Sequence, residues 1–139
     1  MKGSKAMKPH MGVPRKVELD QACVIREGDQ EYCIYPMGDL MAVLGKRWSL
    51  FIIAVLGNER RMRFNDLVRQ LKGISPRTLT DGLRELESLG LVERTLFPEV
   101  PPRVEYTITS EGRDLRRTLI PVLRWAIDFE THGYRRSRG

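Results

Sequence analysis

Apolar residues recur at intervals of three and four positions in five stretches of the chain, the pattern of helices that bury one side. Glycines follow several of these stretches and are expected to end them. Ser75 is expected to cap one helix through its hydroxyl, and Pro76 fits the first helical position after it. Asn65 and Ser110 are expected to cap two others. The predicted helices span residues 36–45, 46–57, 66–71, 75–89 and 110–131.

After Gly90 the apolar period changes to two, which predicts strands over residues 91–97 and 103–109. The Pro-rich run between them would join the two strands as a β-hairpin. A short helix, a turn with Gly73 and a second helix form the helix-turn-helix pattern, and a hairpin directly after it corresponds to a wing. The sequence therefore predicts an α+β, mostly α fold, a winged helix-turn-helix with additional N- and C-terminal helices for dimerisation.

Three regions are expected along the chain. Residues 1–32 are interpreted as a basic N-terminal tail and an irregular lead-in, because no apolar period is visible there. Residues 33–131 would form the winged helix-turn-helix domain with its terminal dimerisation helices. Residues 132–139 would form a basic C-terminal tail.

The helix predicted over 75–89 has two contrasting sides. At about 100° per residue, Leu83 and Leu86 fall within about 40° of Leu79 and predict a core-facing stripe. The opposite side is suited to a major groove, because arginine matches guanine and threonine can bond bases or touch a thymine methyl. Taken alone, the same pattern also fits an ordinary amphipathic surface helix. The outward residues are Arg77, Asp81, Arg84 and Ser88, flanked by Thr78 and Thr80.

Charge is concentrated at the ends of the chain. The formal net charge is +6, but residues 1–16 carry +5 and the last five carry +3, so residues 17–134 hold 16 basic against 18 acidic residues. The total charge therefore does not establish that the folded part binds nucleic acid. Evidence for such binding has to come from the positions of the arginines. Arg63 lies in a basic run before a predicted helix, where phosphates bind readily. Arg103 lies at the foot of the wing, while Arg94 fits either a DNA contact or a cross-strand ion pair with Glu105.

Other kinds of chemistry find little support. His10 and His132 lie in or near the tails, so no metal site is expected, and no phosphate-binding loop or activated nucleophile is visible. The chain is thus expected not to be an enzyme and to need no cofactor. The longest apolar run has seven residues, far short of a membrane span, and no secretory leader is visible. A cytoplasmic protein without a structural disulfide is expected.

Several runs of residues closely resemble HxlR-type winged helix-turn-helix transcriptional regulators over about residues 33–130. The resemblance includes the stretch from Pro36 to Trp48 and the entry to the last helix. The proline-rich wing is its most specific part. The runs are RFNDL (63–67), ISPRTLT (74–80), LRELE (83–87), GLVER (90–94) and PEVPPRVEY (98–106).

This resemblance implies a dimeric regulator that binds double-stranded DNA at a pseudo-palindromic promoter site. It implies that the 75–89 helix reads the major groove and that residues 97–103 lie near the minor groove. The expected DNA-binding residues are Arg47, Arg63, Asn65, Ser75, Arg77, Thr78, Thr80, Asp81, Arg84 and Arg103. The expected dimerisation residues are Met37, Leu40, Met41, Leu44, Leu119, Leu123 and Ile127.

Two positions depart from the family pattern. Some members sense oxidants or electrophiles with a cysteine directly before the proline matched by Pro36, but here Tyr35 stands there and Cys33 lies two residues earlier. Cys33 is thus a candidate redox residue, and a small-molecule or redox effector stays open. Arg47 takes the place of the usual lysine before Trp48. The alternative function is a winged-helix module that binds protein rather than DNA, because fold alone does not set function.

Overall fold

The computed structural model describes residues 23–34 and 39–133, and its contacts divide the chain into two compact units, Met1–Ala42 and Val43–Gly139. The described part of the first unit includes an antiparallel hairpin of β1 (Cys23–Glu27) and β2 (Gln30–Ile34). Gly28 adopts a φ of 61° in the two-residue turn, a conformation that favours glycine. The irregular lead-in predicted here was wrong for the hairpin residues. The predicted domain boundaries stay predictions.

The elements of the second unit follow the predicted order. Helix α1 begins in the first unit and ends in the second, while the start of the predicted 36–45 helix lies outside the described residues. The elements are α1 (Asp39–Leu44), α2 (Arg47–Leu56), β3 (Met62–Arg63), α3 (Phe64–Gln70), α4 (Pro76–Ser88), β4 (Val92–Phe97), β5 (Arg103–Ile108), α5 (Ser110–Asp128) and the π-helical turn η2 (Phe129–Gly133).

The core of the second unit is built where α2, α3, α4 and the sheet meet. Ile52 and Leu56 of α2, Leu67 of α3 and Leu79 of α4 are fully buried. Burial of apolar side chains at roughly 25 cal/mol per Å² is the main stabilising contribution to such a core. The three- and four-residue spacing in the sequence therefore identified the buried faces of these helices correctly.

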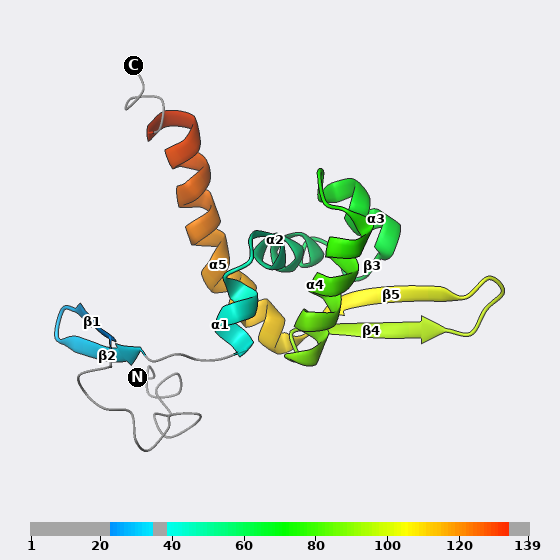
Figure 1. The fold of residues 1–139 in the computed structure, drawn as a ribbon, viewed down its shortest axis with the longest axis horizontal. Coiled ribbons are helices and arrows are strands. Elements are labelled where there is room, and N and C mark those ends of the chain that lie inside the picture. Colours follow the sequence, from blue (N-terminus) through cyan, green and yellow to red (C-terminus); the bar gives the residue numbers. More distant parts are fainter. Residues whose placement is uncertain (1–22, 35–38, 134–139) are drawn as a thin grey trace. The chain divides into compact units, whose positions relative to one another are not determined.

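A three-stranded antiparallel sheet in the order β3-β5-β4 forms the wing and its base. Strands β4 and β5 pair from Val92↔Ile108 to Phe97↔Arg103, and Figure 1 shows this hairpin extending past α3 and α4 to the loop that closes it. Strand β3, which pairs Met62 with Tyr106, was expected to be only a basic connection. The arrangement confirms the predicted winged helix-turn-helix, an α+β fold that is mostly α.

Two predicted helix caps were wrong. Helix α3 begins at Phe64 rather than after Asn65, and the Asp66 carboxylate accepts from the backbone N–H of Arg63 at 3.0 Å. Helix α5 is capped by Thr109, whose Oγ1 accepts from Gly112 N at 3.1 Å, so Ser110 is the first helical residue. Before α5 the extended cap position is taken by Thr109, which caps about as well as the predicted Ser110, whereas before α3 it is taken by Arg63, whose side chain has no acceptor to offer.

Candidate nucleic-acid interface

Helix α4 starts at a well-formed cap. Ser75 Oγ accepts from the backbone N–H of Thr78 at 3.1 Å and donates to Thr78 Oγ1 at 2.8 Å. Pro76 occupies the first helical position, where its missing N–H leaves no bond unmade. The predicted cap is confirmed, and it fixes the end of α4 from which a recognition helix reaches base edges.

Packing against α2 sets which side of α4 is free. Leu79, Leu83 and Leu86 are buried, as the helical spacing predicted. Gly82 lies on the same side, and a Cβ there would come within 2.7 Å of Ile52 Cδ1, so the two helices approach closely at this residue. The sequence analysis missed the packing role of Gly82, although its place beside Leu83 was a usable signal.

The opposite side of α4 is exposed and carries charge. The Arg77 side chain is 92% exposed, and its Nε lies 4.0 Å from Asp81 Oδ2, a loose contact that leaves the guanidinium free to bind elsewhere. Arg84 is also exposed, and the described residues hold no ion pair to it. Thr80 is half-buried and its hydroxyl donates to the Pro76 carbonyl at 2.9 Å. The outward side of α4 therefore presents Arg77, Thr78 and Arg84 to solvent.

A hollow of about 480 Å³ separates α4 from the wing. Thr80, Arg84 and Glu87 line it from α4, and Arg94 lines it from β4. The ion pair expected as an alternative for Arg94 is not formed, because Arg94 stands opposite Tyr106 and Thr95 stands opposite Glu105. The sequence left Arg94 open between these two roles and did not place it among the expected DNA-binding residues, and the strand register separates it from Glu105.

A second hollow, of about 320 Å³, lies between the start of α2 and α4. Arg47, Thr78 and Asp81 line it, and the Arg47 guanidinium lies 4.9 Å from the centroid of the Trp48 ring. Lys46 Nζ donates to both carboxylate oxygens of Glu85 at 2.9 Å, which ties the two helices together. Arg47 thus stays available beside the start of α4.

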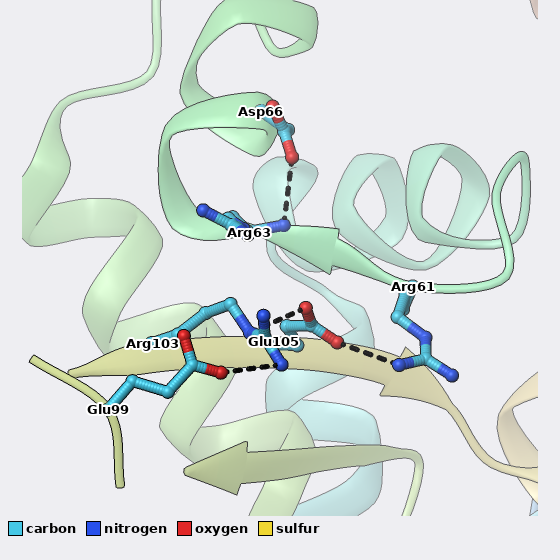
Figure 2. A network of polar contacts seen from close by, with 6 residues as sticks. All are labelled: Arg61, Arg63, Asp66, Glu99, Arg103 and Glu105. Carbon is cyan, nitrogen blue, oxygen red and sulfur yellow. Dashed lines mark hydrogen bonds and ion pairs between the residues drawn. The ribbon is translucent and has the colours of Figure 1, made fainter. Parts of the chain in front are cut away.

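A third hollow, of about 400 Å³, lies between the start of α3 and the wing loop. Its lining includes Arg63 and Asn65 of the α3 start and Arg103 of β5. Arg63 and Asn65 are exposed, whereas the Arg103 side chain is only 27% exposed because it contacts two carboxylates, as Figure 2 shows. Arg103 is therefore not free to bind a phosphate in this conformation.

The predicted dimerisation residues of α5 lie at four-residue spacing on one stripe. Leu119 is 6% exposed and belongs to the core, Leu123 is half-buried, and Ile127 is 61% exposed. The helix thus continues past the core that its first half covers, and Figure 1 shows its second half running away from α2. Leu119 is corrected to a core residue, because almost none of its surface remains for a partner.

Other exposed apolar residues lie near the same end of α5 and on α1. Trp125 and Phe129 stack with ring centroids 5.3 Å apart, and both are exposed. On α1, Leu40 and Met41 are exposed and Leu44 is half-buried. Met37 lies outside the described residues.

The remaining predictions concern Cys33, membrane-spanning helices and metal ligands. Cys33 stands opposite Val24 in the β1–β2 pairing, and its side chain lies outside what the structure describes. Within residues 23–34 and 39–133, no helix has the length and apolar character to cross a bilayer. In the same ranges no three His, Cys, Asp or Glu side chains gather as metal ligands would.

Comparison with known proteins identifies the family of the chain. The HxlR-like helix-turn-helix family model matches residues 43–134. An uncharacterised HTH-type transcriptional regulator of Halalkalibacterium halodurans is 41% identical over 92 residues, which cover 66% of this chain and 81% of that protein.

Two solved structures are similar to this chain. A possible HxlR family transcriptional factor from Thermoplasma volcanium has a TM-score of 0.72 and 33% identity, covering 80% of this chain and 99% of that one. The reduced form of the regulator YodB from Bacillus subtilis has a TM-score of 0.58 and 35% identity, covering 69% and 93%. These relatives are transcriptional regulators, a non-enzymatic class. The chain belongs to the HxlR-like helix-turn-helix family of transcriptional regulators.

Proposed function

We propose that the chain regulates transcription as a homodimer that binds a pseudo-palindromic DNA site, with α4 in the major groove and the wing near the minor groove. The observation that carries this proposal is the free outer side of α4, where Arg77 is 92% exposed while the leucines opposite it are buried. A helix that presents arginine and threonine near its N-terminus matches the way recognition helices read base edges.

The hollow between α4 and the wing offers two arginines to the DNA backbone, which outnumber the one carboxylate of its lining, Glu87. A phosphate running between a recognition helix and a wing would meet Arg84 from one side and Arg94 from the other. Arg47 and Arg63 lie beside the other two hollows and would contact neighbouring phosphates. Such contacts position the protein without reading sequence, which leaves sequence discrimination to Arg77 and its neighbours.

A second copy of the chain is proposed to pack against the C-terminal end of α5. Where this helix has passed the core, exposed Val122, Trp125 and Phe129 lie along one side of it, and exposed Ile127 lies on another. Large apolar groups exposed together mark interaction sites. Two copies related by a two-fold axis would present two α4 helices to half-sites about 10 base pairs apart, or a multiple of that. Dimerisation would also supply the contact area that one small module lacks.

A redox response through Cys33 stays a prediction. The structure of the relative YodB has been solved in its reduced form and after diamide treatment. In this chain the cysteine stands on β2 rather than directly before Pro36. Sensing would need an accessible thiol in an electropositive setting.

The test of the proposed function is selection of binding sites from random double-stranded DNA, followed by affinity measurements on the selected site. Arg77→Ala should weaken specific binding by about 1–3 kcal/mol and relax discrimination at one base pair in each half-site. Ser88→Ala, at the other end of α4, is the matched control and should keep both properties. Failure of the wild-type chain to bind any sequence at low salt would favour the protein-interaction alternative.

A further inference from the structure

Glu105 is a carboxylate that the fold buries in the base of the wing. Its side chain is only 10% exposed, and it is the one charged residue in the buried set of the described chain. Arg61 Nη1 donates to Glu105 Oε1 at 3.2 Å, and Arg103 Nε lies 3.1 Å from Oε2, although not aligned for a linear hydrogen bond. A buried carboxylate is tolerated only when opposite charges and hydrogen bonds surround it, so these two arginines are required partners.

Arg103 has further contacts that hold it in place. Its Nη2 lies 3.1 Å from Glu99 Oε2 in the loop of the wing, and its guanidinium stacks 4.2 Å from the centroid of the Phe97 ring. Figure 2 shows Glu99 and Glu105 on either side of this guanidinium, with Arg61 reaching Glu105 from the segment before β3. The cluster thus joins three separate segments, namely residue 61, strand β5 and the wing loop.

The charge of the cluster argues against a role in attracting DNA. Two arginines and two glutamates cancel, so Arg61, Glu99, Arg103 and Glu105 together add no net charge to the wing. To reach a phosphate, Arg103 would have to leave both carboxylates and the Phe97 ring. Arg94 has no such contacts within the described chain and is the more available cation of the hairpin.

We propose that Glu105 is a positioning residue that locks the wing in one orientation through Arg61 and Arg103, and that Arg103 acts through this lock rather than by binding DNA. The DNA part of this inference rests on the proposed function. The ordering of the wing does not, because it concerns the free protein. Pre-ordering the wing would improve DNA affinity by lowering the entropy lost when the complex forms.

The test compares Glu105→Gln with Glu111→Gln, which removes the same charge from an exposed position in the first turn of α5, outside the cluster. Amide hydrogen exchange of the free protein is followed over residues 99–105 and over α2 and α4. Glu105→Gln should speed exchange in the wing by about tenfold or more, since one partner of a buried ion pair is lost, while α2 and α4 keep their protection. Glu111→Gln should leave the exchange rate of the wing unchanged.

DNA affinity measured across a range of salt concentrations gives the second readout. Glu105→Gln and Arg103→Gln should each weaken binding about fivefold or more with an unchanged salt slope, and the double variant should be no weaker than either. If Arg103 bound a phosphate instead, Glu105→Gln would release it and tighten DNA binding relative to Glu111→Gln. Arg103→Gln would then reduce the salt slope by about one ion. Either of those results, or an unchanged wing exchange rate, would overturn the lock.

Glu99→Gln keeps the inference testable if Glu105→Gln does not fold. It removes only the half-exposed outer partner of Arg103, so the fold should survive and a smaller increase in exchange should appear in the wing alone. Absence of that increase would also overturn the proposal. Wild-type protein that binds no DNA would defeat the proposed function, yet the exchange comparison would still decide whether Glu105 orders the wing.

Discussion

The arginines of the winged helix differ in what their neighbours leave them free to do. Arg61 and Arg103 are held by Glu105, and Arg116 donates to the Ala54 carbonyl at 2.7 Å and to Asn58 Oδ1 at 2.8 Å. Arg77 has only a loose contact, and Arg94 lies open beside the hollow of α4. Removing one partner of a partly buried, hydrogen-bonded charge destabilises the fold, whereas exposed charges contribute little to stability and are available for ligands.

Arg94→Gln is expected to weaken binding to specific and random DNA by the same factor. Removing one phosphate contact should also reduce the slope of log affinity against log salt by about 0.9. Fluorescence anisotropy titrations at several salt concentrations measure both quantities. Arg113→Gln, which removes an exposed charge from the first turns of α5, is the control and should keep the slope. A loss confined to the specific site would instead make Arg94 a base-reading residue.

The elements of the second unit are held at their junctions by side chains that the hydrophobic pattern does not reveal. Thr109 both caps α5 and donates from its Oγ1 to the Gly90 carbonyl at 2.7 Å, so it joins the end of α4, the end of β5 and the start of α5. Gly112 lies next to this junction, where a Cβ would come within 2.2 Å of the Leu91 carbonyl oxygen. The position of α5 therefore depends on a hydroxyl and on the absence of a side chain.

Thr109→Ala is expected to lower the free energy of unfolding by about 1–2 kcal/mol, because a helix cap and a bond to Gly90 are lost together. Ser110→Ala is the matched control, and it should change stability by less than about 0.5 kcal/mol since Ser110 is exposed and does not cap. Urea denaturation of both variants measures the difference. If Ser110→Ala lowered the free energy of unfolding more than Thr109→Ala, Ser110 would be the cap, as the sequence predicted.

For the whole molecule, the decisive feature is an α5 that is longer than the core it covers. Leu119 completes the core of one chain, while Ile127, two turns later on the same stripe, is exposed. A lone chain would leave this apolar end in water, and a symmetric partner would cover it. The proposed dimer thus depends on the second half of α5, with Leu40 and Met41 of α1 as further candidates.

Ile127→Asp is expected to raise the dimer dissociation constant by about tenfold or more, because a charge would be buried in the proposed interface. It should leave the fold of the single chain intact, since Ile127 makes no part of the core. Sedimentation velocity over a range of concentrations measures the association. Thr118→Asp, an equal charge change on an exposed residue of the first half of α5, should not affect it. A wild-type chain that stays monomeric at high concentration would contradict the dimer.

The β1–β2 hairpin of the first unit has a turn that is visible in the sequence. Gly28-Asp29 separates two five-residue runs, and such a dipeptide is a recognised hairpin turn. The mixed charge of residues such as Arg26 and Glu31 hid the strands, because these two side chains form an ion pair across the ladder instead of following an apolar alternation. A Gly-Asp dipeptide between two runs of this length therefore indicates a β-hairpin even when the flanking runs are polar.

By itself, the sequence determined the order of the helices, the hairpin of the wing and the buried face of α4. These features depend on periodicity and capping among residues that are close along the chain, so local sequence is sufficient to specify them. Only the tertiary structure decided which arginines are free. Arg61 and Glu105 are 44 positions apart, and neither spacing nor composition shows that they meet. The register of β4 and β5 separates Arg94 from Glu105. The length of α5 relative to the core decides that Leu119 is buried and Ile127 is exposed.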